Sequence, residues 1–225
     1  MNRNSRSSRT RAGAGNRARS ALAALFIVAG AAVARADNVS LTVEDGHGVY
    51  RVHGTFTAPV SPGVAWAVLT DYDHIGAYVK SIRASAVERR GDGWLLLRQN
   101  ARGGMFPLQR TVHVLLDVRE EQGNRITFHD RLGQDFRLYS GSWVLGDADP
   151  GVSVSYALEA RLITAMPHGL GRGLMGHQAR DLLEQVRAEM VRRATTGSAG
   201  AAGRATVSRL AGDAIGDPQR VARGE

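Results

Sequence analysis

Cysteine is absent from this 225-residue chain, and Lys80 is its only lysine. Without cysteine there is neither a disulfide framework nor a thiol for a lipid anchor at a cleavage point. Long apolar runs are also scarce: only the stretch 21–33 approaches the length that a membrane span requires. The fold must therefore be stable without disulfides.

Excess positive charge is almost absent from the main part of the chain. The formal net charge is +8, but seven arginines and no acidic residue lie within residues 1–36. One excess positive charge remains for residues 37–225. Because nucleic-acid binding needs clustered positive charge on the folded part, we expect no nucleic-acid partner.

Residues 1–36 have the features of a secretory signal peptide. Six arginines precede the uncharged apolar run 21–33, and Ala34-Arg35-Ala36 matches the small-x-small pattern of a cleavage site. We therefore expect cleavage after Ala36 and a periplasmic location. A retained membrane anchor is the alternative, although the run is short for a span and Arg35 follows it directly.

The rest of the chain has two compositions. Residues 37–194 are mixed in character and numerous enough to bury a core without disulfides. Residues 195–225 are mostly glycine, alanine, serine, arginine and aspartate, as in a disordered or weakly helical tail. We therefore predict a signal peptide (1–36), a ligand-binding domain (37–194) and a low-complexity disordered tail (195–225).

Within the domain, the pattern predicts one strand, two short helices, six further strands and one long helix. Ser61 and Pro62 suit the N-cap and first position of the first helix. The connections between the later strands are short, so the strands are antiparallel, and helices gathered at the two ends of the run indicate an α+β fold. Strands are predicted over 48–57, 82–90, 94–102, 108–120, 125–131, 136–146 and 152–164, and helices over 62–70, 74–79 and 171–193.

Periodicity predicts which faces are buried. Apolar residues alternate at 112, 114, 116 and 118 and at 152, 154, 156 and 158, so the sheet has one apolar face. The last helix carries an apolar stripe that begins at Met175. We expect Met175 at the mouth of the space between sheet and helix, with Leu182 and Val186 at its tightly packed base.

The order of elements and three segments resemble the START-like, helix-grip (SRPBCC) superfamily, which contains polyketide cyclases/dehydrases, coenzyme Q-binding proteins and lipid-transfer START domains. The segments are 58–72, Gly-Ser-Trp-Val-Leu at 141–145, and Val-Ser-Tyr-Ala-Leu at 154–158 with the following Pro167. The resemblance covers nearly all of residues 46–194. It implies a curved seven-stranded antiparallel sheet wrapped around the long C-terminal helix, with an apolar cavity between them.

Large side chains are the candidates for lining that cavity. Met105 and Phe106 follow a glycine pair, so their loop could gate the cavity or make transient contact with a membrane. Leu170 and Met175 belong to a glycine-rich lid at the start of the last helix. The complete predicted set is Tyr78, Trp94, Met105, Phe106, Phe128, Tyr139, Trp143, Tyr156, Leu170 and Met175.

Polar candidates depend on which way their strands face. A head group could be held by whichever of these side chains point inward: Arg98, His113, Tyr139, Glu159 and Arg161. The seven histidines lack the spacing of metal ligands. No serine lies in the strand–turn–helix sequence in which a nucleophilic serine is found. No catalytic residue, metal or cofactor is therefore predicted.

These observations favour an exported, monomeric binding or carrier protein for an apolar small molecule such as a lipid, isoprenoid or polyketide-like compound. The alternative is a cyclase/dehydrase-type enzyme that acts on a polyketide-like substrate without a metal. That activity requires an acid and a base that converge inside the cavity. A third possibility is a structural partner whose cavity is filled by its own side chains.

Overall fold

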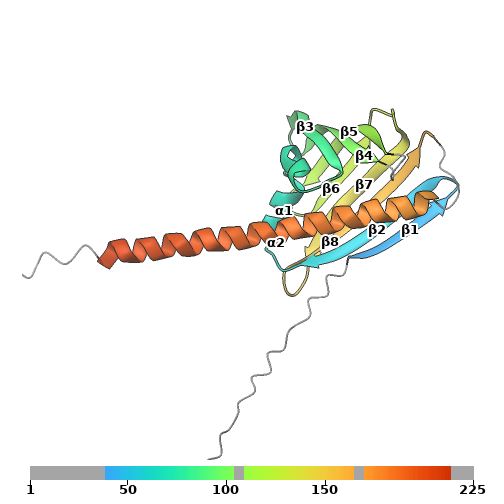
Figure 1. Ribbon diagram of the computed structural model, residues 1–225. Coiled ribbons are helices and arrows are strands. Elements are labelled where there is room, and N and C mark those ends of the chain that lie inside the picture. The colour runs from blue at the N-terminus through green and yellow to red at the C-terminus, as the bar shows by residue number, and fades with distance from the viewer. Residues whose placement is uncertain (1–38, 104–108, 165–169, 214–225) are drawn as a thin grey trace, which may run out of the picture. The chain divides into compact units, whose positions relative to one another are not determined.

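The computed structural model of this chain describes residues 39–103, 109–164 and 170–213, with side chains described as far as residue 197. A single antiparallel sheet has the strand order β1-β2-β8-β7-β6-β5-β4-β3, and the helix α2 lies across part of one face (Figure 1). The predicted α+β, helix-grip fold is confirmed. The elements are β1 (Ser40–Gly46), β2 (Val49–Ala58), α1 (Pro62–Leu69), the 3₁₀ helix η1 (Tyr72–Ala77), β3 (Ile82–Gly91), β4 (Trp94–Gly103), β5 (Arg110–Glu121), β6 (Arg125–Asp130), β7 (Phe136–Asp147), β8 (Val152–Leu162) and α2 (Leu170–Asp213).

The predicted count of seven strands is wrong by one, because β1 forms a hairpin with β2. His47 and Gly48 form its turn with φ angles of 56° and 77°, and the Asp45 carboxylate accepts a hydrogen bond from the Gly48 amide at 3.3 Å. The sequence does contain a strand signal, since Leu41 and Val43 alternate with polar residues. The first predicted strand nevertheless begins only at residue 48.

The predicted apolar face of the sheet is confirmed. The alternating positions of β5 and β8, 112 to 118 and 152 to 158, are all buried. Their neighbours on β8 point to the opposite face and are partly or fully exposed. We call the buried side the inner face and the opposite side the outer face.

Helix α1 begins as its sequence predicts. The Ser61 hydroxyl accepts a hydrogen bond from the Val64 amide at 3.3 Å, and Pro62 occupies the first turn, where an amide hydrogen would have no partner. Together α1 and η1 connect β2 to β3, which forms the far edge of the sheet. The connection from β2 to β3, of which η1 is part, therefore crosses the inner face of the sheet.

Helix α2 is longer than predicted, and its buried face differs slightly from the predicted one. It continues past the predicted end at residue 193 to Asp213, so the first part of the predicted tail is helical; alanine and arginine favour this conformation. Leu183 is fully buried and Val186 nearly so, whereas Leu182 is only half-buried. Leu183, rather than Leu182, therefore occupies the tightly packed base.

Two glycines bring α2 close to the sheet. A Cβ atom placed on Gly54 of β2 would lie 2.3 Å from Cδ1 of Leu183 and 3.1 Å from Cδ1 of Leu41. A Cβ atom on Gly171 of α2 would lie 2.0 Å from the Tyr50 hydroxyl oxygen. Helix α2 consequently packs on β1, β2 and α1.

Polar contacts hold both sides of α2. On the β1 side, the Arg180 guanidinium donates a hydrogen bond to the Val39 carbonyl at 3.1 Å. On the side toward η1 and β3, the Gln185 side-chain oxygen accepts a hydrogen bond from the Lys80 amide at 2.7 Å. Further along, the Arg193 guanidinium lies 2.6 Å from an Asp71 carboxylate oxygen. These contacts fix which side of α2 faces each part of the sheet.

We expect Gly54→Ala to lower the free energy of unfolding by about 1–3 kcal/mol, because the added methyl group overpacks the contact with Leu183. Gly173→Ala is the matched control, since nothing lies within 4 Å of a Cβ atom there and alanine favours a helix by about 0.5–1 kcal/mol. Chemical denaturation of both variants measures the difference. Equal or higher stability of the Gly54 variant would show that α2 does not depend on this close approach.

Candidate functional site

Four of the predicted aromatic residues gather on the inner face, on β6, β7 and β8. Trp143 and Tyr156 pair across β7 and β8 with ring centroids 4.5 Å apart, and Phe128 lies 5.9 Å from Tyr139. Phe136, which was not among the predicted site residues, joins the group 4.7 Å from Tyr139. Neighbouring strands place these rings side by side because antiparallel partners project to the same face.

A glycine makes room for this cluster. Gly141 of β7 pairs with Phe128 of β6 and with Leu158 of β8. A Cβ atom on Gly141 would lie 2.6 Å from Cζ of Phe128 and 2.3 Å from the Ala157 carbonyl oxygen. The Phe128 ring can therefore lie over the backbone of β7, between the positions of Tyr139 and Trp143.

Several inward-facing side chains keep accessible surface. Phe128, Tyr139 and Trp143 point to the side of the sheet that carries α2, yet each is only partly buried. Met175 and Leu182 of α2 are likewise half-buried and lie against the same core. Because α2 packs on β1 and β2, the inner face of β6 and β7 is not sealed by the helix.

The middle of the inner face carries no charged side chain among the residues that the structure describes. The inward positions of β4, β5, β6 and β7 between the strand ends are Leu95, Leu97, Gln99, Ala101, Val112, Val114, Leu116, Val118, Ile126, Phe128, Tyr139, Gly141, Trp143 and Leu145. Glu120 faces inward at one end of β5, where it accepts a hydrogen bond from the Tyr72 hydroxyl at 2.7 Å. A surface of this kind suits an apolar ligand.

Of the five polar residues considered for a head group, only Tyr139 faces inward. Arg98 pairs with Glu88 on β3, and Glu159 pairs with Arg51 on β2 at 2.7 Å, both on the outer face. Arg161 is exposed. His113 packs beside Asp135, which accepts a hydrogen bond from the His113 backbone amide at 2.8 Å. The acid–base cluster that a cyclase would need is not formed by these residues.

Burial raises the pKa values of two inner tyrosines further above neutral pH. It raises the pKa of Tyr139 to about 12, with the nearby Asp130 carboxylate adding to the shift. It also raises the pKa of Tyr156 well above its ordinary value, and Tyr139 adds to that effect. At neutral pH both hydroxyls are therefore hydrogen-bond donors rather than bases.

The other predicted site residues lie apart from the aromatic cluster. Tyr78 donates a hydrogen bond to the Val68 carbonyl at 2.9 Å, and the Arg193 guanidinium carbon lies 5.7 Å from its ring centroid. Trp94 lies beside Gly91 at the β3–β4 turn, out of phase with the buried Leu95. Leu170, the first residue of α2, is 43% exposed. Met105 and Phe106 fall outside the described residues.

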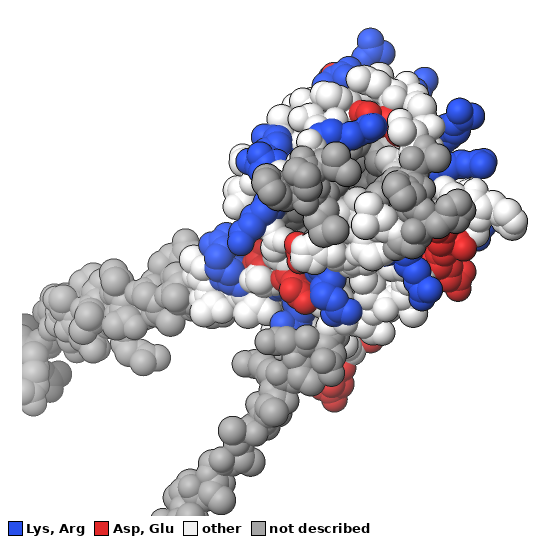
Figure 2. Space-filling view, turned by 45° about the vertical axis from the view of Figure 1, so that its right-hand side comes forward, with Lys and Arg blue, Asp and Glu red and all other residues white. Residues whose placement is uncertain are grey.

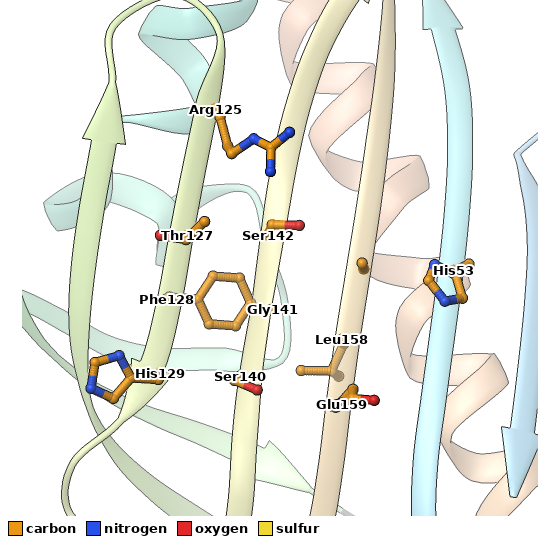
Figure 3. Close-up of a pocket in the computed structure, with 11 residues that line it drawn as sticks. His53, Arg125, Thr127, Phe128, His129, Ser140, Gly141, Ser142, Leu158 and Glu159 are labelled. Carbon is orange, nitrogen blue, oxygen red and sulfur yellow. The ribbon is translucent and has the colours of Figure 1, made fainter.

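Two hollows lie elsewhere on the surface. The larger, of about 530 Å³, is on the outer face over β6, β7 and β8 (Figure 3). Thr127, Ser142 and Ala157 form one cross-strand row of small residues on its floor, and Arg125 and His129 flank it on β6. A second hollow of about 440 Å³ lies between β1 and the start of α2. Neither hollow is predicted from the sequence, and the small outward residues of the first give no hydrophobic signal.

The described part of the chain contains no group of three or more histidine, aspartate or glutamate residues placed to hold a metal ion. None of its helices has the length and apolar character needed to cross a membrane.

Comparison with known proteins gives one family match. The model of the family described as polyketide cyclase / dehydrase and lipid transport matches residues 50–197, which include β2 to β8 and the part of α2 that packs on the sheet. No curated protein matches the sequence significantly.

Solved structures share the fold at low sequence identity. A START superfamily protein from Mycobacterium smegmatis is 14% identical with a TM-score of 0.56, over 63% of this chain and 97% of that one. The Zhui aromatase/cyclase from Streptomyces is 15% identical with a TM-score of 0.54, over 64% and 95%. A STAR-related lipid transfer protein from Xanthomonas axonopodis is 17% identical with a TM-score of 0.51, over 68% and 99%. At these identities the likeness establishes the fold.

Proposed function

Because the chain belongs to the polyketide cyclase/dehydrase and lipid transport family, we propose that it is an exported, monomeric carrier of an apolar small molecule. The ligand, a lipid, isoprenoid or polyketide-like compound, lies between the inner face of the sheet and α2. One observation carries this proposal. The inward-facing aromatic side chains of β6 and β7 are uncharged and remain partly accessible.

The energetics of this surface favour apolar ligands. Each 100 Å² of apolar surface removed from water contributes about 2.5 kcal/mol to binding before the costs of association. An uncharged wall imposes little desolvation penalty on such a ligand, whereas an ionised ligand would lose its hydration without gaining an opposite charge. Phe128 and Trp143 supply broad aromatic contacts, and Met175 is a flexible thioether that can adapt to irregular shapes.

The second candidate is a cyclase/dehydrase-type enzyme. A solved structure with the same fold is named as an aromatase/cyclase, and another as a lipid transfer protein, so the fold is compatible with both functions. Proton transfer needs a base as well as an acid in contact with the substrate. Tyr139 and Tyr156 supply donors, but the Asp130 carboxylate near Tyr139 already accepts hydrogen bonds from three backbone amides at the end of β6. The described middle of the inner face supplies no other carboxylate and no imidazole. We therefore favour the carrier.

Export rests on the signal peptide proposed from the sequence. The arginine-rich start, the apolar run 21–33 and Ala34-Arg35-Ala36 support cleavage after Ala36 and a periplasmic location. A carrier in that compartment would move an apolar compound through an aqueous space.

Native mass spectrometry of protein purified from its own periplasm should find a monomer that begins at Asp37 and carries an apolar small molecule. Denaturing spectra of the same sample give the mass of the chain alone, so the ligand mass follows by difference. A chain that retains Met1 would contradict export, and a ligand-free sample that takes up no added apolar compound would contradict the carrier.

A pair of aspartate substitutions on α2 tests where the ligand lies. Met175→Asp should weaken the binding of a neutral apolar dye at least tenfold, because the introduced carboxylate would face the ligand. The variant should lose little stability, because position 175 is half-buried and the carboxylate stays hydrated there. Leu183→Asp should unfold the domain, since a buried unpaired charge costs several kcal/mol. Melting temperatures and dye titrations measure both. Unchanged dye binding by a folded Met175 variant would place the ligand elsewhere.

We also propose that one end of the domain makes transient contact with an anionic membrane. The large apolar residues that are most exposed in the described structure are Leu132, Ile163 and Leu170, at 37%, 41% and 43%. Leu132 comes shortly after the end of β6, Ile163 comes directly after β8, and Leu170 is the first residue of α2. They therefore lie at the same end of the antiparallel sheet. Exposed Arg161 and Arg172 lie within two residues of Ile163 and Leu170, and Figure 2 shows basic side chains spread over this view.

Co-sedimentation with vesicles tests the membrane proposal. Wild-type protein should bind vesicles that contain phosphatidylglycerol and bind neutral phosphatidylcholine vesicles less, because arginines gain from an anionic surface. The double variant Ile163→Asp/Leu170→Asp should lose most of this binding. Ala86→Asp, on an exposed part of β3, is the control and should bind as wild type does. Equal binding by the double variant would contradict the proposed surface.

A further inference from the structure

The two edges of the sheet differ in how they are protected. Strand β3 forms one edge, and its register against β4 shifts twice along its length. The Val87 amide of this strand donates a hydrogen bond to an Asp73 carboxylate oxygen at 2.8 Å, and residues 88–90 are all charged. Irregular register, charged residues and covered amides are the means by which proteins keep edge strands from pairing. The β3 edge is therefore closed to an additional strand.

Strand β1 forms the other edge, and it has a regular backbone (Figure 1). All seven of its residues pair in unbroken register with β2, and no backbone hydrogen bond joins it to any other described segment. It contains no proline, lysine or arginine, and its charged residues, Glu44 and Asp45, lie at the end beside the turn. At about 3.4 Å per residue, this edge offers roughly 24 Å of backbone donors and acceptors. An extended peptide segment can add to such an edge as a further strand.

The hollow of about 440 Å³ lies directly beside this edge, between β1 and the first turns of α2. Leu41 and Val43 form its apolar floor. Gly173 and Gly176 leave it open on the helix side, and a Cβ atom on Gly173 would meet nothing within 4 Å. Because successive side chains of a strand alternate between faces, every second side chain of an added strand would enter this hollow.

The charges around the hollow select the chemistry of the partner. Arg172, His177 and Arg180 line it, and no carboxylate does. His177 has an acceptor in Asp181 at 3.5 Å, and one guanidinium nitrogen of Arg180 donates to the Val39 carbonyl at 3.1 Å. No described residue pairs with Arg172. An acidic segment would therefore gain charge-assisted hydrogen bonds that the described residues do not already supply.

A second copy of this chain does not fit these charges. Arg180 contacts the start of β1, whereas Gly171, the neighbour of Arg172, lies against Tyr50, which pairs with Asp45 near the end of β1. An antiparallel pair of β1 strands would set the end of one strand beside the start of the other. The arginines of the two copies would then face one another, and like charges in close approach repel. A different, acidic partner is favoured.

The spacing of the two arginines predicts the pattern of the added segment. Arg172 and Arg180 are separated by about 12 Å along α2, and strand positions four residues apart are separated by about 14 Å. Two acidic side chains at that spacing would reach both arginines, and an apolar side chain midway between them would lie over Leu41 and Val43. Glu44 projects from the other face of β1 and is exposed, so the alternate positions should be uncharged.

We propose that the β1 edge is a docking site for an extended acidic segment of a partner protein. The segment adds a strand to the sheet and inserts an apolar side chain between β1 and α2. The site lies at the edge opposite β3 and away from β6 and β7. The inference therefore goes beyond the carrier function and does not depend on it.

Three capped heptapeptides that carry the same dye test the site on the mature chain from Asp37 to Glu225. They are Thr-Glu-Thr-Val-Thr-Glu-Thr, its lysine counterpart Thr-Lys-Thr-Val-Thr-Lys-Thr, and Thr-Glu-Thr-Val-Pro-Glu-Thr, whose proline cannot continue a ladder. Fluorescence anisotropy measures affinity, and amide chemical shifts locate the bound peptide. We expect the first peptide to bind at least tenfold more tightly than the other two, with the largest shift changes in residues 40–46.

Four variants assign the contacts. Arg172→Glu should reduce the preference for the acidic peptide, and Arg172→Glu/Arg180→Glu should reverse it in favour of the lysine peptide. Gly173→Leu fills the hollow and should weaken binding of the acidic peptide at least fivefold without lowering the melting temperature, because its Cβ atom meets no neighbour and leucine favours a helix. Arg83→Glu, exposed on the β3 edge, is the matched control and should keep the wild-type preference.

The outcomes separate the docking site from other occupants of the hollow and from the carrier function. Absence of saturable binding by the acidic peptide, or equal binding of the proline peptide, would overturn strand addition. An acidic preference that survives in Arg172→Glu/Arg180→Glu would overturn the assignment to this edge. A dimer that Gly173→Leu dissociates would identify a second copy as the occupant, and anionic vesicle binding that Gly173→Leu abolishes would identify a lipid; either result would overturn the proposal.

The neutral dye Nile red reports on the carrier site in the same samples. Its affinity should be unchanged by the acidic peptide and by Gly173→Leu, because the two sites lie on different strands. Loss of peptide binding with retained dye binding would overturn the docking site and leave the carrier. Retained peptide binding without dye binding would overturn the carrier and leave the docking site.

Discussion

The close contact between α2 and β2 at Gly54 determines the arrangement of the rest of the domain. Since Gly54 has no side chain, Leu183 packs directly on the strand, and α2 is held against β1 and β2. The same helix cannot then cover β6 and β7. Strands that are buried in a two-layer fold normally have a partner layer. Here part of the inner face lacks one, which is why its aromatic side chains remain accessible.

Charged side chains lie around this uncovered region and not within its described part. At one end, Glu120 accepts a hydrogen bond from Tyr72 and forms an ion pair with Arg90 at 3.8 Å, and the Asp71–Arg193 pair fastens α2 to η1 outside the sheet. Asp130 accepts hydrogen bonds from three backbone amides, those of Leu115, Leu132 and Gly133, so its carboxylate stabilises the end of β6. These ionised groups have structural partners, and the middle of the inner face remains available to uncharged ligands.

The sequence predicted features that depend on local periodicity and missed those that depend on tertiary contacts. Alternation on β5 and β8 identified the inner face, and with it the position of Tyr156. Trp94 was selected for its size, but a strand position one residue from the buried Leu95 faces the other way. Leu182 and Leu183 are equally apolar, so only the contact with Gly54 decides which is fully buried.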